Sequence, residues 1–155
     1  NTPLTSLLFV VLALAGGALL SANIDAALMF LLTAGVLQIA YWIGGDQLFR
    51  KSGTTLCTAT GLGQGGDVRA FEPPHTGTNY LLREFVHVVG RKHATKLRII
   101  SLILMTGTPI LALSLTFNYL STLIAVIAHV SGVFVSRWLF FAQAEHVVGL
   151  YYGKR

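Results

Sequence analysis

The chain has 155 residues, of which 54% are hydrophobic and only 11% are charged, and its mean hydropathy is +0.68. These values exclude an ordinary water-soluble domain and indicate a membrane protein. The single cysteine, Cys57, excludes both an internal disulfide and a thiolate-ligated zinc or iron–sulfur site made by this chain alone. The formal net charge is +5, and eight of the eleven lysines and arginines lie between Arg50 and Arg98. Because apolar segments flank this basic stretch, the distribution is typical of membrane topology rather than of nucleic-acid binding.

Two apolar segments open the chain. Residues 4–22 and 26–43 are each long enough to cross the hydrocarbon core of a bilayer, and Pro3 suits the first position of the first helix. The short polar turn between them, with Asn23 and Asp25, predicts an antiparallel hairpin that ends at Gly44 and Gly45. No basic leader precedes the first segment, so we expect that it is not a signal peptide and that the chain is a piece of a longer one.

Residues 46–98 interrupt the apolar pattern with a polar, glycine-rich and basic segment, which we predict to be an extramembrane loop. Within it, apolar residues recur at three-to-four spacing over residues 80–96, which predicts a helix along the membrane interface. This basic helix is suited to anionic lipid headgroups or an acidic partner, or it only marks the cytoplasmic side. The glycines of residues 61–66 match a dinucleotide-binding pattern, but no predicted strand precedes them, so we interpret them as flexible loop.

A second pair of apolar segments closes the chain at residues 99–117 and 120–148. Pro109 removes a backbone donor from the third segment and predicts a kink there. The expected fold is therefore an all-α integral membrane protein with four transmembrane helices in two antiparallel hairpins. By the positive-inside rule we expect the loop of residues 46–98 and both chain ends to lie in the cytoplasm. The expected location of this multi-pass protein is the bacterial inner membrane.

Ionisable residues within the fourth segment are the first candidates for chemistry, because a charged group in hydrocarbon costs a few kcal/mol. At about 1.5 Å per residue, His129 lies roughly 15 Å and Arg137 roughly 27 Å along the helix from Tyr119. His129, Arg137 and Glu145 are spaced by eight and share one broad face. The functional interpretation is a quinone headgroup site made by Arg137, Glu145 and His146. The alternatives are an Arg137–Glu145 ion pair with a solvated His146, and for His129 a hydrogen bond to a neighbouring helix.

The second segment adds Gln38, Tyr41 and Trp42, a polar and aromatic cluster at the same membrane level. These residues are further candidates for quinone contact, and an aromatic belt at the membrane interface is the alternative. A haem held by two histidines is not expected, because His129 has no histidine partner in the other three apolar segments. We therefore predict neither haem nor metal in this chain and no catalytic residues.

Several short stretches carry a resemblance to a known family. They are NTPL at residues 1–4, TNYLLRE at residues 78–84, RKHATKLR at residues 91–98, RWLFFA at residues 137–142, His146, and GLYYG at residues 149–153. Together they resemble the DmsC family, the membrane anchor subunits of dimethyl sulfoxide reductase. The resemblance covers most of the chain and aligns it with the C-terminal half of an eight-helix subunit.

The resemblance implies a complex of three subunits, in which a molybdopterin catalytic subunit and an iron–sulfur electron-transfer subunit dock on the anchor. The anchor exchanges electrons with the quinone pool and is not catalytic alone. Some members of the family oxidise menaquinol in anaerobic respiration, whereas sulfite dehydrogenase-type complexes pass electrons into menaquinone or ubiquinone. The family's quinol-site residues lie in its N-terminal half, so none is carried over to this chain.

Two other functions remain open. The chain is a purely structural anchor if quinone chemistry is confined to another part of the subunit. It is half of a membrane transporter if the Pro109 kink and His129 form a substrate path, although the two predicted hairpins show no convincing internal repeat.

Overall fold

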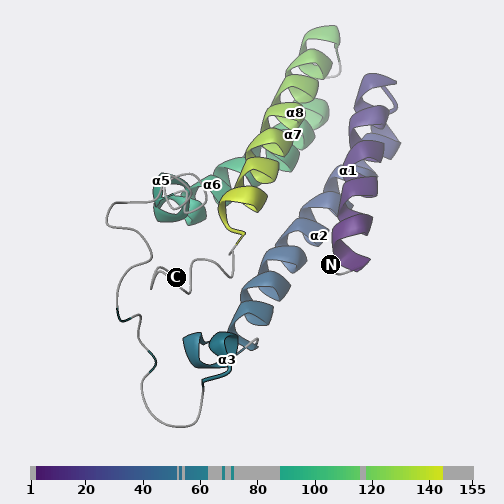
Figure 1. Ribbon diagram of the computed structural model, residues 1–155. Coiled ribbons are helices and arrows are strands. Elements are labelled where there is room, and N and C mark those ends of the chain that lie inside the picture. Colours follow the sequence, from purple (N-terminus) through teal and green to yellow (C-terminus); the bar gives the residue numbers. More distant parts are fainter. Residues whose placement is uncertain are drawn as a thin grey trace.

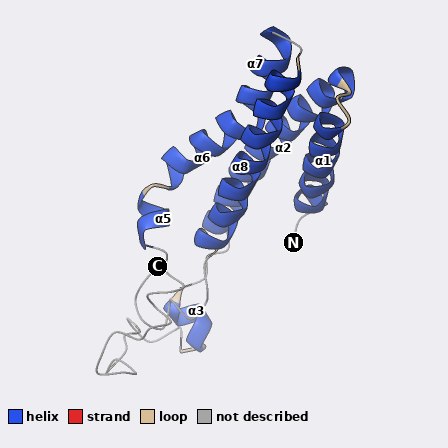
Figure 2. Ribbon diagram, turned by 90° about the horizontal axis from the view of Figure 1, so that it is seen from above, coloured by secondary structure: helices blue, strands red, loops and turns tan. Residues whose placement is uncertain are grey.

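The computed structural model describes residues 3–51, 53, 55–62, 68, 71, 88–115 and 118–144, and within these ranges every regular element is a helix (Figure 2). The elements are α1 (Pro3–Leu20), α2 (Ile24–Lys51), α3 (Leu56–Thr60), α5 (Val88–Lys92), α6 (Ala94–Leu102), the π-helical segment η1 (Ile103–Gly107), α7 (Thr108–Leu115) and α8 (Tyr119–Ala142). Four stretches are long and apolar enough to cross a membrane, namely Pro3–Leu20, Ile24–Gln47, Ala94–Leu115 and Tyr119–Ala142. The prediction of an all-α membrane protein with four spans is confirmed.

The four spans form two hairpins, because α1 packs along α2 and α7 packs along α8. Both hairpin turns lie at one end of the bundle, whereas the beginning of α1, α3 and α5 lie at the other end (Figure 1). Asparagines cap the helices that leave the turns. The side-chain oxygen of Asn23 accepts the Ala26 amide proton at 3.2 Å, and that of Asn118 accepts the Ser121 amide proton at 2.8 Å. These bonds satisfy amide groups that would otherwise be unpaired in the membrane.

Two buried apolar clusters hold the hairpins together. The cluster nearer the turns consists of Ala15, Ala18, Leu19, Ala27, Leu31, Leu113 and Ala125. The other consists of Leu8, Val11, Leu12, Ala34 and Met105. The outer surface of the bundle is apolar as well, with Val36 68% exposed, Leu111 62% exposed and Phe134 71% exposed. A surface of this kind is suited to lipid rather than to water.

The second and fourth spans end at different places from those predicted. α2 continues through Gly44 and Gly45 to Lys51, because glycine in a helix costs only about 1 kcal/mol and does not by itself end one. The fourth span was predicted to reach residue 148, but α8 ends at Ala142 with Gln143 as its C-cap. The rest of that predicted span, residues 145–148, lies outside the described residues.

The basic loop also differs from its prediction. Residues 80–87 of the predicted interfacial helix lie outside the described residues, and the part that is described is not one helix. α5 ends at Lys92, and α6 begins at Ala94 and continues into the third span. Lys96 therefore belongs to a membrane-spanning stretch. The kink predicted at Pro109 stays a prediction, and the turn before the proline is the π-helical segment η1, a feature often associated with kinks and with functional sites.

Candidate functional site

His129 lies in the contact between α8 and the third span. Its side chain is buried, with 3% of its surface exposed, and its Nδ1 atom lies 2.7 Å from the carbonyl oxygen of Met105. A carbonyl oxygen only accepts hydrogen bonds, so Nδ1 carries the proton and donates it. The hydrogen bond to a neighbouring helix that the sequence offered as an alternative for His129 is therefore present.

Pro109 explains why a carbonyl group is available to His129. In a regular α-helix the Met105 carbonyl would accept the amide proton of residue 109, four positions along. Proline has no amide proton, and no water is present in hydrocarbon to replace it. The imidazole of His129 thus bonds a backbone acceptor whose ordinary α-helical donor position is occupied by Pro109.

Gly132, one turn after His129 on α8, makes this hydrogen bond possible by letting the two backbones approach closely. A Cβ atom at residue 132 would lie 2.7 Å from the Met105 Cα atom and 2.8 Å from the Leu104 carbonyl carbon, and closer still to the Met105 nitrogen. Real Cβ contacts are not that short, so only glycine fits here. Small residues at helix interfaces commonly have this role in membranes.

Arg137 lies about two turns beyond His129 on α8. Its guanidinium carbon is 3.9 Å from the centroid of the Phe9 ring on α1. This is a close cation–π contact. Its Nε atom is buried and has no hydrogen-bond partner among the described residues. The predicted alternative partner, Glu145, lies outside the described residues, as does His146. Buried donors without a partner are uncommon in proteins, which makes Arg137 a candidate ligand-binding residue.

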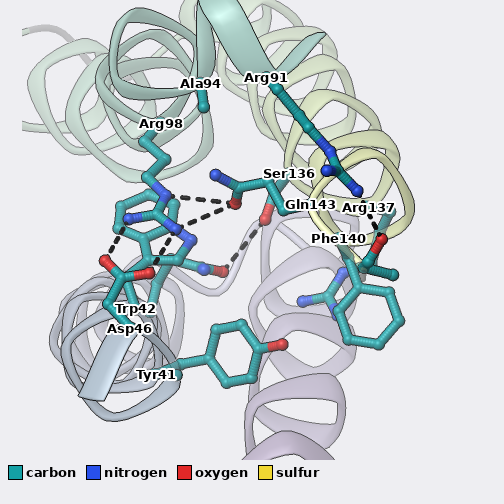
Figure 3. Close-up of a pocket in the computed structure, with 13 residues that line it drawn as sticks. Tyr41, Trp42, Asp46, Arg91, Ala94, Arg98, Ser136, Arg137, Phe140 and Gln143 are labelled. Carbon is teal, nitrogen blue, oxygen red and sulfur yellow. Dashed lines mark hydrogen bonds and ion pairs between the residues drawn. The ribbon is translucent and has the colours of Figure 1, made fainter. Parts of the chain in front are cut away.

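A cavity of about 420 Å³ lies beside Arg137 at the end of the bundle opposite the hairpin turns (Figure 3). We refer to it as the polar cavity. It is lined by Gln38, Tyr41, Trp42, Gly45, Asp46, Arg91, Ala94, Arg98, Ser136, Arg137, Phe140, Gln143 and Ala144. Four of the seven predicted site residues, Gln38, Tyr41, Trp42 and Arg137, thus line one cavity. His129 does not line it, because it lies two turns deeper on α8.

One wall of the polar cavity is fixed by a buried hydrogen bond between α8 and α2. The Ser136 hydroxyl donates to the Gln38 side-chain oxygen at 3.2 Å, and both residues are buried. The Tyr41 ring packs against that of Phe140, with centroids 6.4 Å apart. The aromatic cluster is therefore part of a cavity wall.

Two arginines that line the polar cavity were not predicted as site residues. Arg98 forms a bidentate ion pair with Asp46 at 2.7 and 2.9 Å, donates to the Gln143 side-chain oxygen at 3.0 Å, and lies 5.6 Å from the Trp42 ring. Arg91 donates to the carbonyl oxygens of Ala142 and Ala144 at 3.2 and 3.1 Å. These contacts join α2, α5 and α6 to the end of α8.

The sequence interpretation used Arg91 and Arg98 only as topological charges. A signal for Arg98 is nevertheless present, because Asp46 closely follows the second apolar segment and Arg98 directly precedes the third. In consecutive antiparallel spans such residues lie at the same membrane level. The contacts of Arg91 depend on how α5 turns back over α8, and the local sequence holds no comparable signal for them.

A second, almost entirely apolar cavity of about 340 Å³ lies between α1 and α8, and we refer to it as the apolar groove. Its α1 wall consists of Phe9, Leu12, Ala13 and Gly16, and its α8 wall consists of His129, Val130, Val133, Phe134 and Arg137. Arg137 lines both this groove and the polar cavity. Among the described residues, no group of three His, Cys, Asp or Glu side chains is arranged to hold a metal ion.

The helices and cavities define a class, a multi-pass α-helical membrane protein with a cationic, aromatic-lined cavity at one end of its spans. The chain is 29% identical over 168 residues to a sulfite dehydrogenase subunit of Allochromatium vinosum, an alignment that covers 98% of the chain and 51% of that protein. The chain thus spans about half the length of the curated relative it matches. No model of a known protein family matches the chain, and no solved structure matches it.

The name of this relative is that of an oxidoreductase subunit, in keeping with the type of complex that the sequence resemblance implies. The narrower resemblance to the DmsC family stays a prediction.

Proposed function

We propose that this chain is part of the membrane anchor subunit of an oxidoreductase complex and that its polar cavity binds the headgroup of a quinone or quinol. The similarity to a sulfite dehydrogenase subunit supports the first half of the proposal. The observation that carries the second half is Arg137, whose Nε donor is buried without a partner among the described residues and whose side chain lines the polar cavity.

The lining of the polar cavity matches the chemistry of a quinone. A planar ring with two carbonyl oxygens needs hydrogen-bond donors at its edge and flat apolar groups at its faces. Arg137 and the Tyr41 hydroxyl supply donors, while the rings of Tyr41, Trp42 and Phe140 supply faces. Arginine suits this position because its fixed fork of donors stays charged in an apolar environment.

The reaction that we propose for the complex needs partners for both electrons and protons. Oxidation of one quinol to quinone releases two electrons and two protons, and reduction of quinone takes up the same numbers. The chain has one cysteine, so we assign the electron acceptor or donor to an iron–sulfur partner subunit and the terminal reaction to a molybdopterin subunit. The protons exchange with water at the membrane face that carries Asp46 and Arg98.

The proposal includes the orientation of the complex. The end of the bundle with α5 carries Arg91 and Lys92 in α5 and Lys96 in the first turn of α6. By the positive-inside rule this end lies at the cytoplasmic face of a bacterial inner membrane. The polar cavity then opens toward that face. Anionic lipid headgroups are natural neighbours of the exposed Lys92 and Lys96 side chains.

Binding of a quinone-site inhibitor to the purified complex tests the proposal. We expect Arg137→Ala to weaken binding of a fluorescent hydroxyquinoline N-oxide by roughly 10- to 100-fold, because a hydrogen bond to a charged group contributes about 1.5–3 kcal/mol. Lys96→Ala is the matched control, since Lys96 is an exposed cation outside the cavity lining. Unchanged affinity in an assembled Arg137→Ala complex would exclude the polar cavity as the headgroup site and favour a purely structural anchor.

Glu145 and His146 remain proposed contributors to this site. If they take part, Glu145→Gln and His146→Gln also weaken inhibitor binding without changing the yield of the complex. The third possibility, half of a transporter, predicts substrate flux in proteoliposomes that lack the partner subunits.

A further inference from the structure

The apolar groove between α1 and α8 is not used by a headgroup in the polar cavity. Its walls are almost entirely apolar, although His129 and Arg137 contribute to them. The Nδ1 atom of His129 is bound to Met105, and the Arg137 guanidinium lies over the Phe9 ring. The Nδ1 donor of His129 is thus occupied by Met105, while its Nε2 atom faces the position of Gly16 in the groove wall.

The groove is open to the lipid side of the bundle. Phe9 is 48% exposed, Val130 is 44% exposed and Phe134 is 71% exposed. Its depth comes from two small residues of α1, Ala13 and Gly16, because a larger side chain at either position would occupy the space. A Cβ atom at Gly16 would meet the His129 ring at 3.7 Å, which is ordinary van der Waals contact.

The groove and the polar cavity meet at a single side chain, that of Arg137, which lines both. From Arg137 to His129 the groove follows eight residues of α8, or about 12 Å at the rise of an α-helix. An isoprenoid unit has four bonds along the chain and extends by roughly 4–5 Å. The groove is therefore long enough for about two to three isoprenoid units.

We propose that the apolar groove holds the first isoprenoid units of the tail of the quinone whose headgroup lies in the polar cavity. This inference rests on the proposed function and adds that the tail leaves the headgroup past Arg137 and lies between α1 and α8. A biological quinone has a polar ring joined to a long apolar tail, and the two adjoining cavities have the same division. A tail in this groove contacts packed side chains on two sides while its far end remains in lipid.

Photoaffinity labelling tests the path of the tail directly. The probe is a naphthoquinone with a diazirine on its second isoprenoid unit, which is bound to the purified complex, irradiated and located by peptide mass spectrometry. We expect labels on α1 between Phe9 and Gly16 and on α8 between His129 and Phe134, and we expect excess tail-less naphthoquinone to remove them. Competed labels on other helices would overturn the tail path while leaving the headgroup site intact.

Lipid is the competing occupant of an apolar groove, and the same experiment separates the two sources. If the groove is labelled by the quinone probe but tail-less naphthoquinone does not remove the label, the groove holds acyl chains rather than a bound tail, and the inference fails. A phospholipid with a diazirine on its acyl chain is the comparison probe. Under the proposal, its labelling of the groove falls when a three-unit quinone is added.

Two adjacent glycines provide matched variants for an affinity test. Gly16→Leu fills the groove, whereas Gly17→Leu places the same side chain on the same helix where no atom lies within 4 Å. Because the tail moves into the groove from lipid rather than from water, we expect Gly16→Leu to weaken the binding of a quinone with three isoprenoid units by only about five- to tenfold. Gly16→Leu should leave the affinity for the tail-less quinone within about twofold of the wild-type value. Equal effects of Gly16→Leu and Gly17→Leu on the binding of the three-unit quinone would overturn the inference. The headgroup site is tested separately, by whether Arg137→Ala loses binding of the tail-less quinone.

Discussion

Pro109 and His129 are joined through one backbone carbonyl, that of Met105, and this link can be measured with a double-mutant cycle. His129→Leu removes the donor that lies 2.7 Å from the carbonyl oxygen and leaves a buried acceptor unpaired. Leaving a buried polar group unpaired costs about 1–3 kcal/mol in soluble proteins, and hydrogen bonds between membrane helices average about 0.6 with a maximum near 1.7 kcal/mol. We therefore expect His129→Leu to lower the free energy of unfolding by about 1–2 kcal/mol.

Pro109→Ala changes the size of that loss. Alanine restores an amide proton at residue 109, which gives the Met105 carbonyl its ordinary helical partner. In the Pro109→Ala background, the cost of His129→Leu should fall by about 0.5–1.5 kcal/mol. The assay is reversible unfolding in mixed micelles at increasing mole fraction of dodecyl sulfate, followed by circular dichroism.

Ser136→Ala is the control for this cycle, because Ser136 is a buried polar residue of the same helix that bonds Gln38 instead. Its effect should add to that of Pro109→Ala within about 0.3–0.5 kcal/mol. If His129→Leu costs the same free energy in both backgrounds, the proline is not the reason for the position of the histidine. The link described for Met105 would then be refuted.

Three other substitutions test the packing and the membrane-face contacts. Gly132→Ala places a Cβ 2.8 Å from the Leu104 carbonyl carbon, so the helices must separate. We expect the free energy of unfolding to fall by about 2–3 kcal/mol in the same assay. Gly17→Ala is the control, because the space around Gly17 is open, and it should be neutral or slightly stabilising. Asp46→Asn breaks the ion pair with Arg98 and should lower the free energy of unfolding by less than about 1 kcal/mol, because the Asp46 carboxylate is half exposed. This cost should shrink as salt is raised from about 0.01 M to 1 M. A cost that does not change with salt would contradict an electrostatic origin. Asn118→Ala removes the cap of α8 and should cost about 1 kcal/mol, and a helix that is equally stable without it would show that the cap is dispensable.

The number and type of the spans could be predicted from the sequence because one physical constraint dominates. Backbone groups in hydrocarbon must bond within their own helix, so long apolar segments have few alternatives. The boundaries were less predictable. Gly44 and Gly45 did not end α2, since a helix that is already held by tertiary packing tolerates glycine.

The site was predicted in part, and the difference follows from what composition and spacing contain. Depth along a helix is readable, and it placed Gln38, Tyr41 and Trp42 near Arg137. Depth also separates His129 from that cavity, because His129 lies eight residues before Arg137 on α8. The direction of a side chain around the helix depends on packing, so the contact of His129 with Met105 was not readable. The link between His129 and Pro109 is also non-local, because it depends on the close approach that Gly132 allows.

The contribution of Arg98 shows a second limit. A cationic residue at the end of a span satisfies the positive-inside rule whether or not it also pairs with a specific carboxylate. Sequence position puts Arg98 and Asp46 at one membrane level, and the side-by-side placement of α2 and α6 shows that the two residues pair (Figure 3). Topological charge and site charge therefore overlap in this chain.

Electron transfer between quinone and the iron–sulfur clusters of the purified, assembled complex is the most direct measurement of the central proposal. The cluster redox state would be followed by electron paramagnetic resonance after mixing with a short-tailed quinol or quinone, for wild type, Arg137→Ala and Lys96→Ala. We predict a rate at least about tenfold lower in Arg137→Ala, corresponding to the loss of a charged hydrogen bond, and a wild-type rate in Lys96→Ala. A wild-type rate in fully assembled Arg137→Ala would contradict the assignment of the polar cavity to the quinone.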